Sequence, residues 1–127
     1  MKTLTLVRHA KSSWDNKDWA DIERPLNEKG LLDAPLMADV IAKKLHPKPD
    51  LILSSNALRA FSTANIFAQA LGYNEDSVVI ENGIYDRGTK YIIKLLKTQP
   101  DELDSILLIG HNPEVTSIAT YFLGEYI

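Results

Sequence analysis

Four short apolar runs, rich in valine, isoleucine and leucine, are spaced along the chain at residues 4–7, 51–53, 78–80 and 106–109. They are close to continuous and do not alternate strictly between apolar and polar positions. Such runs are typical of β-strands that are covered on both faces. The pattern therefore predicts four buried strands.

Amphipathic helical patterns separate these runs and cover residues 31–45, 57–71, 90–97 and 113–123. The first pattern places four large apolar side chains on one face, which we expect to pack on the core. They are Leu32, Leu36, Val40 and Ile41. Pro35 lies inside this pattern, so we expect a kink there or a helix that begins closer to Asp33. Asn112 and Pro113 are placed as N-cap and first residue of the last helix.

The alternation of strands and helices predicts an α/β fold with a mainly parallel sheet and helices on both faces. A chain of 127 residues can bury one core, so we expect a single domain over residues 1–127. Residues 11–27 have no sustained period and are interpreted as a loop. Loops of this length in compact domains are usually functional.

Charge and composition exclude several classes of function. Fourteen Lys and Arg against seventeen Asp and Glu give a net charge of −3, which provides no general attraction for nucleic acid or an anionic membrane. The absence of cysteine excludes disulfides, cysteine-ligated zinc and cysteinyl-phosphate chemistry. Neither a signal-peptide pattern nor a membrane-spanning run is present, so we expect a cytoplasmic protein.

Titratable side chains follow the predicted strands at the point where each strand ends. Arg8 and His9 follow the first, Arg59 begins the helix after the second, and His111 follows the fourth. The carboxyl ends of parallel strands form one edge of the sheet, where ligands bind in such folds. We therefore expect these four side chains to converge.

A converging group of cationic side chains indicates a site for an anion. Without one, the charges would repel each other by several kcal/mol at intermediate dielectric. Arginine offers a planar fork of donors that matches a phosphoryl group, and the helix beginning at Pro113 can add its N-terminal amides. The same positive charges oppose a divalent metal at His9 and His111, so we expect no metal.

His9 is the candidate nucleophile for such a phosphoryl group, since the chain has no cysteine and no aspartyl-phosphate motif. Arg8 and Arg59 should disfavour a further positive charge and keep its imidazole neutral near pH 7. One ring nitrogen must then face phosphorus, while a hydrogen bond, expected to come from the backbone, holds the other.

The chain also resembles the histidine phosphatase superfamily, and within it the small SixA-type phosphohistidine phosphatases. The resemblance rests on four motifs in order: LVRHA at residues 6–10, extended to RHAKSSW at 8–14; RPLNEKG at 24–30; SS at 54–55 with RA at 59–60; and IGHNP at 109–113. It implies a three-layer α/β/α sandwich of the phosphoglycerate mutase-like type.

The resemblance also implies residue roles. His9 would be transiently phosphorylated, while Arg8, Arg59 and His111 would clamp the phosphoryl group. Arg24 would be a fifth, substrate-side residue, with an ordinary ion-pair arginine as the alternative. No cofactor is implied.

The chain departs from the family pattern in three places. Ala10 stands where many members carry glycine. The chain also stops at Ile127, where members usually continue, so a C-terminal tail is expected to be missing.

The third departure lies after the third strand, where the mutase branch carries a glutamic acid. Here Glu81 and Asp86 both compete as a possible acid. The alternative is that both are solvated loop carboxylates. Imidazole needs less help from a protein acid as a leaving group than an alkoxide does, so a missing acid favours a phosphohistidine substrate.

The leading hypothesis is thus a phosphohistidine phosphatase that acts through phospho-His9, on a phosphorylated protein or a small phosphorylated molecule. The alternatives are a phosphatase of small phosphate esters or a mutase-like enzyme, and a noncatalytic phosphate-binding module.

The long loop also carries two tryptophans, Trp14 and Trp19. They either line a protein-docking surface or pack beneath the loop.

Overall fold

A four-stranded parallel sheet forms the centre of the molecule. The structure, a computed structural model, describes residues 3–46 and 48–124. The strands are β1 (Thr3–Arg8), β2 (Leu51–Ser54), β3 (Val78–Ile80) and β4 (Ser105–Gly110), in the spatial order β1-β4-β2-β3. All three pairings are parallel. The predicted strands and the parallel sheet are confirmed, with each boundary within one residue.

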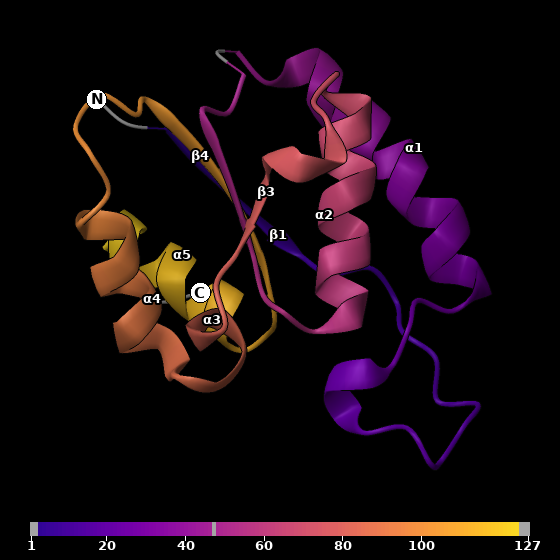
Figure 1. Cartoon of the computed structure of the whole chain (residues 1–127). Helices are drawn as coiled ribbons and strands as arrows, with labels where there is room; N and C mark the ends of the chain where they lie inside the picture. Colours follow the sequence, from indigo (N-terminus) through magenta and orange to yellow (C-terminus); the bar gives the residue numbers. More distant parts are fainter. Residues whose placement is uncertain (1–2, 47, 125–127) are drawn as a thin grey trace.

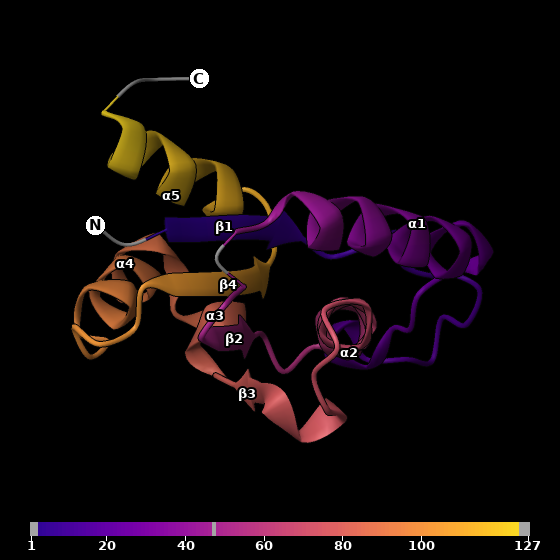
Figure 2. The same ribbon diagram turned by 90° about the horizontal axis from the view of Figure 1, so that it is seen from above.

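Helices cover both faces of the sheet and make the three predicted layers (Figures 1 and 2). One face carries α1 (Glu28–Lys44) and α2 (Leu58–Ala70). The other carries α3 (Gly83–Asp86), α4 (Gly88–Lys97) and α5 (Glu114–Leu123). Short 3-10 helices, η1 (Asp21–Glu23) and η2 (Glu75–Ser77), lie in the connections. No helix in the described ranges is long and apolar enough to span a membrane.

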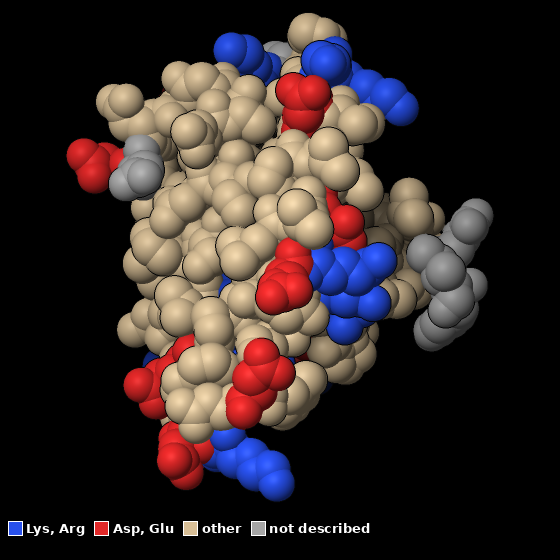
Figure 3. All heavy atoms as spheres, turned by 90° about the vertical axis from the view of Figure 1, so that its right-hand side faces the viewer, with Lys and Arg blue, Asp and Glu red and all other residues tan. Residues whose placement is uncertain are grey.

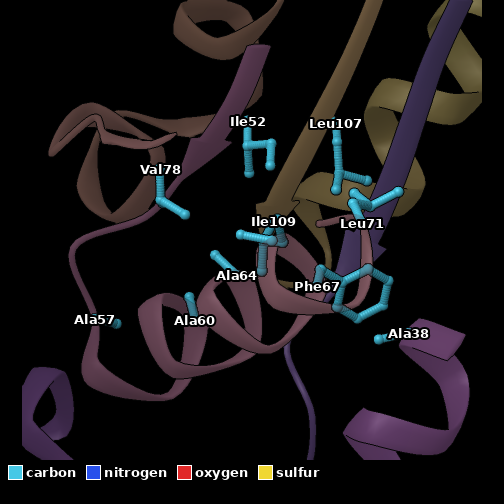
Figure 4. Packing of buried hydrophobic residues seen from close by; sticks show 11 residues of the cluster. Ala38, Ile52, Ala57, Ala60, Ala64, Phe67, Leu71, Val78, Leu107 and Ile109 are labelled. Carbon is cyan, nitrogen blue, oxygen red and sulfur yellow. The ribbon is translucent and has the colours of Figure 1, made fainter. Parts of the chain in front are cut away.

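The alternation of side chains along β4 divides the core into two halves. Leu107 and Ile109 pack toward α2, where Phe67 fills the space between the helix and the sheet (Figure 4). Ile106 and Leu108 pack with apolar residues of α4 and α5 on the opposite face. Every residue of β4 is buried, as the continuous apolar run predicts.

The predicted inner face of α1 is wrong for three of its four residues, whereas Ile41 is half-buried and packs against the core as expected. Leu32, Leu36 and Val40 are 70%, 69% and 46% exposed, whereas Ala34 and Ala38 are buried. The physical reason is the closeness of packing, because a Cβ on buried Gly30 would lie 2.2 Å from the Lys11 carbonyl oxygen. Small residues therefore form the packed face. The side of the molecule that faces right in Figure 1 accordingly shows broad uncharged areas (Figure 3).

The first residues of α1 and α5 also differ from the prediction. Asn27 caps α1 by accepting a 2.7 Å hydrogen bond from the Gly30 amide, so the helix starts three residues early and runs through Pro35. α5 begins at Glu114, and Asn112 Oδ1 instead accepts from the Thr116 amide at 3.1 Å. In both cases an asparagine side chain satisfies an amide of the first turns.

The long loop between β1 and α1 is closed at its base by short-range pairing. Ser12 and Leu26 form an isolated antiparallel bridge, and the Ser13 amide donates to the Pro25 carbonyl at 2.8 Å. Leu26 is buried under the loop. This closure fixes the position of the residues between, including η1, above the start of α2.

Candidate active site

The ends of β1 and β4 bring His9 and His111 together. The strands pair in parallel with Arg8 opposite Gly110, and the His9 amide donates to the Gly110 carbonyl at 3.0 Å. The two imidazole rings are half-buried, with their centroids 5.1 Å apart. The predicted meeting of these histidines at one sheet edge is therefore what the structure shows.

A backbone contact sets the orientation of the His9 ring. Its Nδ1 lies 2.7 Å from the Ala10 carbonyl oxygen, which can only accept, so Nδ1 carries the proton. The Nε2 atom is left with a free lone pair. Ala10 is itself fixed, because its amide donates to Thr63 Oγ1 at 3.1 Å, and the Thr63 hydroxyl donates to the Arg59 carbonyl.

The pKa of His9 is lowered from its ordinary value of 6.5, so the ring is neutral at pH 7. Burial is the largest cause, and the charges of Arg59, Arg8 and Arg24 lower it further against the opposing hydrogen bond to Ala10. Arg8 and Arg59 were expected to act in this direction. Burial contributes more than any one of them, which the sequence does not reveal.

His111 is also neutral and is held by a serine at the end of β2. Its Nε2 lies 2.8 Å from Ser55 Oγ, which already accepts from the Ala57 amide. The Ser55 hydroxyl can donate its proton to Nε2, and in that arrangement the imidazole proton sits on Nδ1. Burial and the neighbouring His9 lower the pKa of His111 to about 4.

Arg59 is buried near the start of α2 and is anchored by Asp21 of η1. Its Nη2 donates to Asp21 Oδ2 at 2.9 Å, and its Nη1 donates to the Asp21 carbonyl at 2.6 Å. The Tyr85 hydroxyl donates to the same carboxylate oxygen at 2.7 Å. Chiefly through the Tyr85 hydrogen bond, the pKa of Asp21 is lowered, so Asp21 is ionised at neutral pH.

Arg24 is also buried and lies near the other carboxylate oxygen of Asp21. Its Nη2 donates to Ser12 Oγ at 2.6 Å, and its Nε lies 3.6 Å from Asp21 Oδ1. The guanidinium carbon is 3.3 Å from the centroid of the Trp14 ring. Arg24 thus makes the ion pair that was one reading from the sequence, and it also lines the cavity, while its role toward a substrate stays a prediction.

These side chains line one cavity of about 1190 Å³. Four of the nitrogen atoms are buried without a hydrogen-bond partner: Arg24 Nε, Arg24 Nη1, Arg59 Nε and His111 Nδ1. Buried donors of this kind normally have partners. Four cationic residues line the cavity against three carboxylates, so the local charge is +1: Arg8, Lys11, Arg24 and Arg59 against Asp21, Asp33 and Glu114. Donors and charge together fit a phosphoryl dianion.

The two candidate acids lie outside this cavity. Glu81 accepts a 2.8 Å hydrogen bond from the Tyr91 hydroxyl, and Asp86 is exposed at the end of α3. Neither lines the cavity, whose carboxyl groups come from Asp21, Asp33 and Glu114. Among the described residues, no cluster of three or more His, Asp or Glu is placed to hold a metal ion.

Sequence reasoning missed Asp21 and Tyr85, which connect the long loop, α2 and α3. They are 64 positions apart, and neither follows a strand directly. The only local signal was the position of Asp21 in a long loop, three residues before Arg24. The arrangement depends on how the loop folds back over α2.

The imidazoles of His9 and His111 are expected to titrate below pH 6.5 in the free protein, with His111 near pH 4. Saturating inorganic phosphate should raise both pKa values, because a neighbouring anion favours the protonated ring. Proton–carbon NMR titration tests this, with His46→Gln removing the third imidazole signal. Unchanged titration midpoints would show that the anion does not bind beside these rings.

Asp21→Asn is expected to lower kcat roughly tenfold on a phosphorylated substrate, with a smaller change in KM. The variant keeps the shape of the side chain but weakens charge-assisted hydrogen bonds to Arg59 and Tyr85. It also removes a negative charge that repels phosphate, which limits the loss of binding. Asp18→Asn, in an exposed part of the same loop, is the control. An equal loss in both variants would argue against positioning by Asp21.

Comparison with known proteins places the chain in a family. Residues 4–89 match the profile of the histidine phosphatase superfamily (branch 1). An uncharacterized chloroplast protein of Arabidopsis thaliana is 31% identical over 99% of this chain and 61% of its own length. A 2,3-bisphosphoglycerate-dependent phosphoglycerate mutase of Clavibacter michiganensis is 33% identical over 56% of this chain and 29% of its own.

The fold is shared with a crystal structure from Agrobacterium tumefaciens that is provisionally named phosphohistidine phosphatase SixA. The TM-score is 0.85 at 33% identity, over 96% of this chain and 77% of that one. The chain spans less than two thirds of the length of both curated relatives. With more than half of its residues matching the family profile, the chain belongs to the histidine phosphatase superfamily.

Proposed function

We propose that the protein is a phosphohistidine phosphatase that works through a covalent phospho-His9 intermediate. The observation that carries the proposal is the state of His9: a neutral ring, held at Nδ1 by the Ala10 carbonyl, with its Nε2 lone pair free in a cationic cavity. Membership of the superfamily and the likeness to the Agrobacterium structure support it.

In the first step, the Nε2 lone pair of His9 forms a bond to phosphorus while the phosphorus–nitrogen bond of the substrate breaks. The leaving imidazole keeps the electron pair of that bond and takes a proton from solvent. Arg8, Arg24 and Arg59, with His111 Nδ1–H, donate to the nonbridging oxygens, where negative charge is stabilised in the transition state.

In the second step, water attacks phosphorus and the bond to Nε2 breaks. His9 regains its lone pair, the water releases a proton to solvent, and inorganic phosphate leaves. The proton taken up in the first step balances the one released in the second. The enzyme returns to its starting state without a cofactor.

The ionisation of Asp21 favours phosphohistidine over a phosphate ester. An alkoxide leaving group needs a protonated acid beside it, and Asp21 is held in the charged form by Tyr85 and Arg59. Glu81 and Asp86, the two candidate acids from the sequence, do not line the cavity. An imidazole leaving group depends less on such an acid.

The test measures the release of phosphate from a phosphohistidine peptide, from a small phosphate ester and from 3-phosphoglycerate. A second assay traps the acid-labile phosphoenzyme after brief exposure to each substrate. We expect fastest turnover of the phosphohistidine peptide and a trapped phosphoenzyme. Faster ester turnover, lost in Glu114→Gln, would identify an acid on α5 and make the protein an ester phosphatase. Phosphate binding without any phosphoenzyme would indicate a noncatalytic binding module.

A further inference from the structure

Trp14 presents an aromatic surface at the edge of the cavity that the mechanism does not use. Its side chain is 75% exposed, yet it lines the same cavity as His9. Trp19, in the same loop, is half-buried and does not line the cavity. Indole rings are enriched at the centres of recognition surfaces because they combine large contact area with few rotatable bonds.

The Trp14 ring is fixed before any ligand binds. The Arg24 guanidinium lies 3.3 Å from its centroid, within the range of a cation–π contact. The neighbouring Ser13 is buried, its amide donates to the Pro25 carbonyl, and its Oγ accepts from the Asp15 amide. The hydrogen bonds of the neighbouring backbone and the contact with Arg24 together restrain the exposed indole.

Arg24 links this ring to the phosphoryl position. Its Nη2 is committed to Ser12, whereas Nε and Nη1 are buried without a hydrogen-bond partner. A phosphoryl oxygen that accepts from these atoms would lie next to the indole. The group attached to phosphorus would then lie close to Trp14.

We propose that Trp14 binds the leaving side of the substrate, namely the imidazole and adjoining backbone of a phosphohistidine within a polypeptide. This inference rests on the proposed function and names the form of its substrate. A planar imidazole can stack on an indole, and the flanking peptide can cover the exposed remainder of the ring. Phosphoramidate carries only an amino group at this position, which has no planar ring to stack on the indole.

The experiment measures kcat/KM for a phosphohistidine peptide and for phosphoramidate itself in the same variants. In Trp14→Ala, the ratio of the two values is expected to fall about five- to tenfold, mainly through a higher KM for the peptide. Trp14→Phe keeps an aromatic ring and should retain at least half of the ratio. Trp19→Ala is the matched control and should leave the ratio unchanged.

Two outcomes would overturn the inference alone. An equal loss on both substrates would mean that Trp14 acts only by placing Arg24, and an unchanged ratio in Trp14→Ala would mean that the indole does not touch the substrate. Failure of the proposed function looks different. In that case the wild-type protein forms no phosphoenzyme or does not act on the peptide, which would overturn both.

Discussion

Replacing His9 by alanine is expected to abolish the acid-labile phosphoenzyme and to lower kcat on the order of 10⁶-fold, as loss of a covalent nucleophile does elsewhere. No other side chain in the cavity combines a neutral imidazole with an unprotonated nitrogen lacking a partner, since His111 Nε2 is occupied by Ser55. Rapid quench with a radiolabelled phosphoryl donor measures both quantities.

Phosphate binding separates this result from simple disruption of the cavity. The His9→Ala variant keeps all three arginines, so inorganic phosphate should still bind, and calorimetry can measure it. His46→Ala removes an exposed histidine outside the cavity and should keep full activity. A trapped phosphoenzyme in His9→Ala would contradict the assignment of His9 and direct attention to another nucleophile.

The meeting of His9 and His111 could be predicted from the sequence because it depends on one rule. Parallel strands end at the same edge, so residues that directly follow apolar runs share that edge. The same rule placed Arg59 close to them, because the helix that carries it starts four residues after β2 ends. Motif position and sheet direction were sufficient, without any knowledge of side-chain packing.

Other features depend on tertiary contacts that have no local signal. The Asp21 carboxylate joins Arg59 and Tyr85 only because the long loop folds over α2. The orientation of α1 follows from a close approach to Lys11 that admits only glycine at position 30. Periodicity favoured the leucine face of α1, and close packing selected the alanine face.

Arg59 is the second residue whose loss should have a large effect. Arg59→Ala is expected to lower kcat/KM by about 10² to 10³-fold, the range found when a transition-state donor is removed. The variant loses the Nε donor and the charge beside the phosphoryl group. It also removes one influence that lowers the pKa of His9, so that pKa should rise toward 6.5 in the free protein.

Arg59→Lys separates the charge from the geometry of the donors. Lysine keeps the positive charge, but its compact ammonium lacks the planar fork with which separate nitrogens of Arg59 donate to the carbonyl and the carboxylate of Asp21. We therefore expect lysine to recover phosphate affinity more than kcat. Arg87→Lys, an exposed arginine outside the cavity that lies over the Tyr91 ring, controls for a general effect of the substitution. Full recovery of kcat in Arg59→Lys would show that charge alone suffices and that the network around Asp21 does not set the rate.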